Sequence, residues 1–98
     1  MRWVTITVLA SLTIANGAAA QTIPNIAGHY WCSGNCGGQT TIEQAGGAVT
    51  CINERNEVSY GRFTDRRTFV GCWNLRATVS EALDSIDWHN GTWWNKQH

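Results

Sequence analysis

The fold is decided by the stretch Ile86-Asp87-Trp88-His89-Asn90-Gly91-Thr92-Trp93-Trp94. An Asn-Gly pair between bulky apolar residues is the strongest short-range sequence signal for a β-hairpin. Each of the three tryptophans can bury a large area once the two strands pair. The stretch therefore predicts a hairpin whose indoles need further strands to pack against.

Two turn geometries fit this stretch, and they bring different side chains together. A two-residue turn at Asn90-Gly91 places Trp88 opposite Trp93. A three-residue turn over 89–91, with Gly91 left-handed in a bulge, places Trp88 opposite Thr92. The hairpin alone leaves both registers open.

We favour the three-residue turn because it separates the apolar from the charged side chains on the two faces of the hairpin. It gathers Ile86, Trp88 and Trp94 on one side of the hairpin and leaves Asp87 and Trp93 on the other. An apolar face with a charged residue opposite is what a half-buried strand requires. This register predicts that Trp88 and Trp94 belong to the core and that Trp93 is exposed.

The first twenty residues have the pattern of a secretory signal peptide. Met1-Arg2 gives a positive start, residues 3–14 are mostly apolar, and Ala18-Ala19-Ala20 offers a cleavage site. The apolar stretch is shorter than the ~20 residues that a membrane span needs. We therefore expect 1–20 to be a signal peptide and 21–98 to form one small domain without a membrane span, secreted or periplasmic.

Composition limits the possible partners of residues 21–98. The whole chain has 7 basic and 7 acidic side chains, and Arg2 lies in the expected signal peptide. The balance gives no electrostatic footprint for nucleic acid. A domain this small has a marginal hydrophobic core, so covalent cross-links are expected to stabilise it.

Short segments rich in β-branched and aromatic residues recur between Gly, Asn and Asp turn signals. We expect strands at 28–32, 39–45, 48–53, 58–63, 67–73 and 75–80, followed by the two hairpin strands. On the strand 67–73, Phe69 and Trp73 would face one side and Cys72 the other. Turn signals every 8–12 residues predict an all-β fold, a small antiparallel meander closing into a barrel-like sheet.

Four cysteines in an exported chain indicate disulfides. They allow three pairings, of which we favour Cys32–Cys36 with Cys51–Cys72. The second bridge would join strands that are two apart, so it must cross the interior or an end of the sheet. A zinc site made by all four is the alternative, but Cys51 and Cys72 lack the close spacing of structural zinc ligands. No metal and no cofactor is expected.

Several short motifs resemble a known group of proteins. They are Gly28-x-Tyr30-x-Cys32, Cys36-Gly37-Gly38, Ile42-x-Gln44-x-Gly46 and Ile86-x-Trp88-x-Asn90-Gly91-Thr92-x-Trp94. Together they resemble a set of small exported proteobacterial β-domain proteins of uncharacterised activity, over most of residues 26–94. Gly28-x-Tyr30 is also similar to the Gly-x-Trp opening of lipocalin and avidin barrels. The resemblance implies a fold and a location but no catalytic residue.

No catalytic motif is present. His29, His89 and His98 stand far apart in the sequence, without partners at metal-ligand spacing. The carboxylates at 54 and 57, or at 84 and 87, are local pairs beside turns, and so small a domain has little room for a cleft. The chain is therefore not expected to be an enzyme.

The tryptophans offer the best candidate binding residues. Indole provides a large rigid face and one hydrogen-bond donor, which suits stacking on sugar rings. We expect Trp93, and with it Trp31, to be the binding residues. The sequence thus favours an exported, non-catalytic binding domain for a glycan or another envelope component. The alternative is a protein–protein interaction module such as a hydrolase inhibitor.

Overall fold

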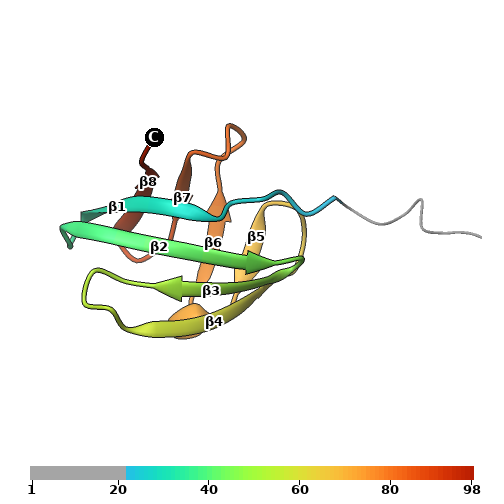
Figure 1. The fold of residues 1–98 in the computed structure, drawn as a ribbon, viewed down its shortest axis with the longest axis horizontal. Coiled ribbons are helices and arrows are strands. Elements are labelled where there is room, and N and C mark those ends of the chain that lie inside the picture. Colours follow the sequence, from blue (N-terminus) through green and yellow to red (C-terminus); the bar gives the residue numbers. More distant parts are fainter. Residues whose placement is uncertain (1–21) are drawn as a thin grey trace, which may run out of the picture.

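A computed structural model describes residues 22–98, and the expected signal peptide, 1–20, lies outside them. Eight antiparallel strands follow one another around a closed barrel, in which β8 pairs with β1 (Figure 1). The strands are β1 (Gly28–Gly34), β2 (Gly38–Ala45), β3 (Ala48–Ile52), β4 (Val58–Phe63), β5 (Thr68–Val70), β6 (Arg76–Val79), β7 (Ser85–Asp87) and β8 (Thr92–Lys96). The predicted all-β meander closing into a barrel is confirmed. Within the described residues, no helix has the length and apolarity to cross a membrane.

The final hairpin adopts the three-residue turn. Ile86 lies opposite Trp94 in the register of β7 and β8, and the Trp88 N–H donates to the Thr92 carbonyl at 3.1 Å. Gly91 has a φ of 85°, a left-handed conformation that glycine adopts without steric cost. This register buries Ile86, Trp88 and Trp94 and leaves Trp93 exposed, as the sequence predicts.

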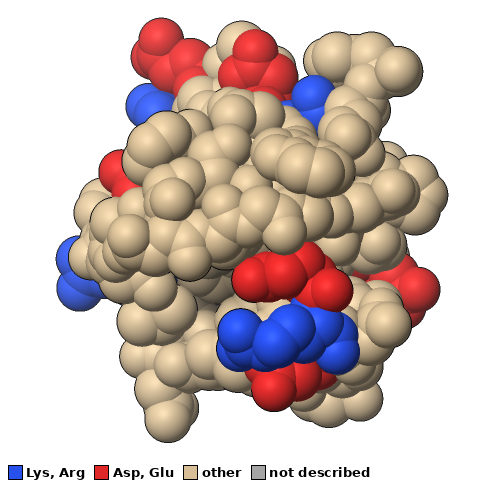
Figure 2. Space-filling view, turned by 90° about the vertical axis from the view of Figure 1, so that its left-hand side faces the viewer, with Lys and Arg blue, Asp and Glu red and all other residues tan. Residues whose placement is uncertain are grey.

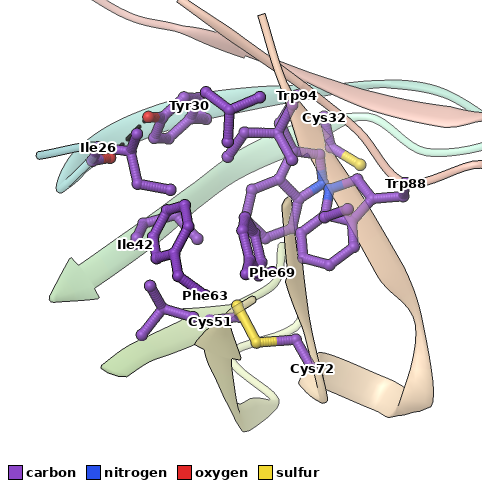
Figure 3. Packing of buried hydrophobic residues seen from close by; sticks show 14 residues of the cluster. Ile26, Tyr30, Cys32, Ile42, Cys51, Phe63, Phe69, Cys72, Trp88 and Trp94 are labelled. Atoms are coloured by element: carbon purple, nitrogen blue, oxygen red, sulfur yellow. Dashed lines mark hydrogen bonds between the residues drawn. A yellow bond between two sulfur atoms is a disulfide. The ribbon is translucent and has the colours of Figure 1, made fainter. Parts of the chain in front are cut away.

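Aromatic rings fill the interior of the barrel (Figure 3). The ring centroids of Trp88 and Trp94 lie 4.9 Å apart, in an edge-to-face arrangement. Phe69 packs edge-on against Trp88 at 5.5 Å, and Phe63 packs against Phe69 at 5.4 Å. A barrel of eight strands has an interior just wide enough for side chains. A few large aromatic rings are therefore enough to fill it.

The segment before β1 closes one end of the barrel. Ile26 is fully buried there, and its carbonyl accepts a hydrogen bond of 2.6 Å from the Tyr30 hydroxyl. The Gln44 amide holds the same segment, because its oxygen accepts from the Ile26 N–H and its nitrogen donates to the Pro24 carbonyl. Burial raises the pKa of Tyr30 to about 12.

The predicted strand at 67–73 is too long. Strand β5 ends at Val70, and Cys72–Asn74 form a 3₁₀ turn, η2. Gly71 has a φ of 115°, which turns the chain out of the extended conformation. Cys72 therefore points into the barrel and is buried, whereas strand alternation would place it on the outside. Trp73 lies in η2 and not in a strand, so the prediction of its face does not apply.

Both favoured disulfides are present. Cys32–Cys36 and Cys51–Cys72 have Cα–Cα distances of 5.6 and 6.2 Å. The second bridge crosses the inner side of β4, where Gly61 has no side chain; a Cβ there would lie 3.1 Å from the Cys72 sulfur. In the chain-entropy description, closing this loop of 21 residues stabilises the fold by about 3 kcal/mol.

Replacing Trp88 should test the assignment of the two hairpin faces. We expect Trp88→Ala to lower the free energy of unfolding by about 3–5 kcal/mol, because it leaves a cavity between Phe69 and Trp94. The matched control, Trp93→Ala, should cost clearly less, about 1–2 kcal/mol, because that indole is 45% exposed and its removal leaves no enclosed cavity. Guanidinium denaturation of the oxidised protein measures both. Equal losses would contradict the assignment.

Tyr30 should make the barrel sensitive to alkaline pH. Its pKa is raised from 10.0 to about 12, so the folded protein favours the neutral phenol. The contribution of the neutral phenol to stability is complete below pH 10 and is lost as the pH rises toward 12. The free energy of unfolding should fall by about 2–3 kcal/mol over this range. Denaturation curves between pH 9 and 12 measure it. Tyr30→Phe should abolish this fall and Tyr60→Phe should keep it; the reverse pattern would refute the assignment.

Candidate functional site

The two tryptophans selected from the sequence lie on the outer surface of neighbouring strands. Trp31 on β1 is 47% exposed and Trp93 on β8 is 45% exposed. In the register of these strands, Trp31 faces Asn95 and Ser33 faces Trp93. The two indoles are thus diagonal neighbours on one face, at a Cα separation of about 7–8 Å.

Polar side chains flank both indoles. On the outer face, Trp31 lies between Gln39 of β2 and Asn95 of β8. Residues directly opposite in antiparallel strands point to the same side of the sheet. Both amides are exposed, so each can donate and accept hydrogen bonds beside the Trp31 ring.

The surroundings of Trp93 follow the same pattern. Ser33 of β1 and Asp87 of β7 lie opposite it on its two sides. The ring extends over β1, because a Cβ added to Gly34 would lie 3.1 Å from its outer edge. Gly34 thus has room for both the Gly91 carbonyl and the edge of this indole, where a side chain would clash.

A second feature is a hollow of about 360 Å³ at the end of the barrel opposite Ile26, which we call the mouth. Four chain segments meet there: the turn after β1, the loop between β3 and β4, η2 with the following residue, and the β7–β8 turn. The lining residues are Cys32, Asn35, Cys36, Asn53, Glu54, Arg55, Glu57, Trp73, Leu75, Trp88, Asn90, Thr92 and Trp94. Acidic and basic side chains lie side by side at this end (Figure 2).

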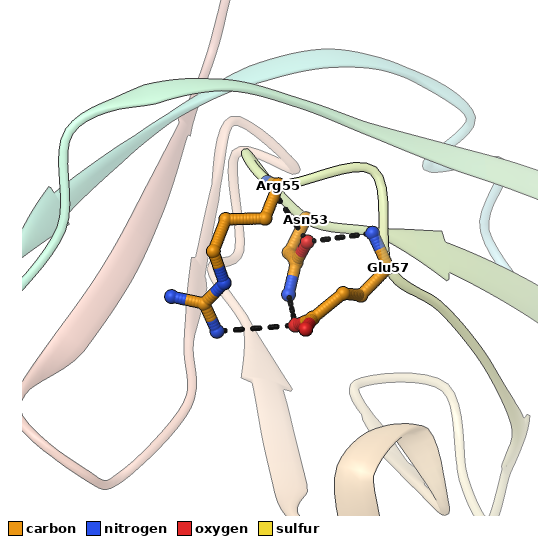
Figure 4. A network of polar contacts seen from close by, with 3 residues as sticks. All are labelled: Asn53, Arg55 and Glu57. Atoms are coloured by element: carbon orange, nitrogen blue, oxygen red, sulfur yellow. Dashed lines mark hydrogen bonds and ion pairs between the residues drawn. The ribbon is translucent and has the colours of Figure 1, made fainter.

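The charged side chains of the β3–β4 loop pair with one another (Figure 4). The Glu57 carboxylate accepts hydrogen bonds from the Asn53 amide at 2.7 Å and from Arg55 at 3.1 Å. These two bonds lower the pKa of Glu57, and the same carboxylate raises the pKa of Arg55. This part of the rim therefore carries a compensated ion pair.

Two of the three histidines considered as ligands or bases, His29 and His89, are hydrogen-bonded to different threonines. His29 Nδ1 lies 3.1 Å from the Thr41 hydroxyl, and His89 Nε2 lies 2.8 Å from the Thr78 hydroxyl. The one group of three potential metal ligands found within residues 22–98 is Cys32, Cys36 and Glu54. Its two sulfurs are joined in a disulfide, so neither is a thiolate that could bind a metal.

The carboxylates at 84 and 87 have structural partners. Asp84 accepts a hydrogen bond from the Ser80 hydroxyl at 2.9 Å, and Asp87 accepts from the His89 backbone N–H at 2.9 Å. Such short-range bonds fix turns, as aspartate side chains commonly do. Asp84 and Asp87 therefore each have a local structural role at their turns.

Comparison with known proteins adds no assignment. No protein-family model matches the chain. Neither the curated proteins nor the solved structures contain a match. The resemblance to small exported proteobacterial proteins therefore stays a prediction, and the function must be argued from the geometry alone.

Sequence reasoning missed the mouth. Its residues come from four loops that are distant in the sequence, and Trp73 was assigned to a strand. Its backbone is left-handed, with a φ of 50°, and its ring packs against Trp88 at a centroid distance of 5.8 Å. The glycine at 71 was the one local signal that the chain turns before this tryptophan.

Proposed function

We propose that this protein is an exported, non-catalytic carbohydrate-binding domain whose site is the outer face around Trp31 and Trp93. The observation that carries the proposal is the exposure of these two indoles on adjacent strands, at 47% and 45%. Large aromatic rings are normally buried, and the barrel already has its own aromatic core. Two exposed indoles on one face therefore need an explanation other than packing.

The surroundings of the indoles favour a sugar over a purely apolar ligand. A sugar ring has an apolar C–H face that stacks on indole and hydroxyls at its edge that need hydrogen-bond partners. Gln39 and Asn95 flank Trp31, and Ser33 and Asp87 flank Trp93. Each indole thus offers a stacking surface with polar groups on both sides.

Two observations agree with export and with a binding role. Both disulfides are of the kind that persists in an oxidising compartment. His29, His89 and Asp84 are each hydrogen-bonded to a neighbouring hydroxyl, as structural residues commonly are. A binding domain needs no convergent acid and base, whereas an enzyme does.

Titration with glycans tests this proposal. The oxidised protein is titrated with N-acetylglucosamine trimer and with β-linked glucose trimer while tryptophan fluorescence is followed. We expect at least one trimer to shift the emission, and Trp31→Ala and Trp93→Ala each to weaken its binding about tenfold because a stacking surface is lost.

The matched control is Tyr60→Ala, because Tyr60 is 71% exposed on β4, away from the proposed site. Its affinity for the trimer should stay within twofold of the parent protein. Absence of any response to either trimer would refute the proposal. So would equal weakening by all three substitutions, because binding would then not depend on this face.

A further inference from the structure

The Trp88 indole N–H is the one buried side-chain nitrogen or oxygen in residues 22–98 without a hydrogen-bond partner. Trp88 itself is 2% exposed. A buried donor that has lost water and gained no acceptor destabilises the fold, so native proteins rarely keep one. Such a group needs an explanation, and a bound molecule that supplies the missing acceptor is one.

This nitrogen belongs to a residue that lines the mouth. The ring of Trp88 packs between those of Trp94, at 4.9 Å, and Trp73, at 5.8 Å. Trp73 also contacts Trp94, at 6.3 Å. Three indoles therefore form the apolar part of the hollow, and such walls favour a flat apolar ring.

The charged residues that line the mouth are Glu54, Arg55 and Glu57, two carboxylates and one guanidinium, so the lining does not favour an anion. Arg55 and Glu57 are paired at 3.1 Å, and Asn53 donates to the same carboxylate. The volume of about 360 Å³ lies at the lower end of the range for small-molecule sites. A neutral molecule of one or two rings matches this size and stacks on the three indoles without needing a charged partner.

We propose that the mouth binds a neutral molecule with a planar apolar ring and a hydrogen-bond acceptor, and that this acceptor takes the Trp88 indole N–H. That nitrogen is shielded from solvent, so a ligand reaches it only if a neighbouring ring shifts. Trp73 is the partly exposed member of the triad and is the ring that the proposal requires to shift. The site is separate from the outer face of Trp31 and Trp93 and does not depend on its function.

The backbone of η2 is held in place, so any movement of Trp73 is confined to its side chain. Gly71, Trp73 and Asn74 all have positive φ, at 115°, 50° and 58°. Non-glycine residues in this region of the backbone are held there by their surroundings. Here the Cys51–Cys72 bridge and the bond from the Trp73 N–H to the Ser59 hydroxyl, at 2.9 Å, hold the backbone while the ring remains partly exposed.

The experiment compares two probes that differ in the acceptor. Acetophenone and ethylbenzene have the same planar ring and nearly the same size, but only acetophenone has a carbonyl. The ¹⁵N-labelled, oxidised protein is titrated with each while the indole N–H signals are followed by NMR. The signal that disappears in Trp88→Phe assigns Trp88. Trp93→Phe is the matched control, since it removes an indole outside the mouth.

We expect acetophenone to move the Trp88 indole proton downfield and to bind about 3- to 10-fold more tightly than ethylbenzene. Trp88→Phe should remove this preference, whereas Trp93→Phe should keep it. Equal affinity for the two probes would overturn the role of the Trp88 N–H. No shift of the Trp73, Trp88 or Trp94 signals with either probe would overturn the site. The comparison of the two affinities comes from the unmodified protein, so it stands even if Trp88→Phe fails to fold.

Discussion

The contact between Trp88 and Trp94 lies inside the barrel, with ring centroids 4.9 Å apart. Both residues belong to the last hairpin, and the three-residue turn points them to the same side. Strand β8 then pairs with β1, so the side chains of β8 that face outward are determined as well. Burial of these two rings thus requires Trp93 to be outside, beside the outward residues of β1.

The disulfides and the segment before β1 add to the stability that the aromatic core provides. The core of so short a chain is small, and about 3 kcal/mol from the Cys51–Cys72 bridge is a large share of the stability of a small domain. Ile26 fills the end of the barrel that the hairpin does not reach. The opposite end stays hollow because loops, and not a packed segment, surround it.

Local patterns in the sequence predicted most of the fold. Asn90-Gly91 and the alternation around it gave the hairpin, its register and the exposure of Trp93. The favoured cysteine pairing is also confirmed. The predicted end of β5 was wrong because the alternation of residue types continues through Gly71 in the sequence. The backbone turns at Gly71, and Cys72 then reaches Cys51 across β4.

The candidate site was predictable only in part. The exposure of Trp93 followed from the hairpin register, whereas the face of Trp31 depended on how β1 lies between β2 and β8. The mouth could not be predicted, because Trp73, Trp88 and Glu54 meet there through closure of the whole sheet. Short stretches of sequence do not show which distant segments pair. The lack of a hydrogen-bond partner for the Trp88 N–H could therefore be seen only in the structure.

Closure of the barrel through β1 and β8 is the central claim, and native-state hydrogen exchange tests it most directly. The amides that hydrogen-bond between β1 and β8 should be protected to nearly the same free energy as those between β2 and β3, because both pairings belong to one closed sheet. Rapid exchange along β1–β8, with β2–β3 still protected, would contradict the account. It would mean that the sheet is open and that Trp31 and Trp93 do not share a face.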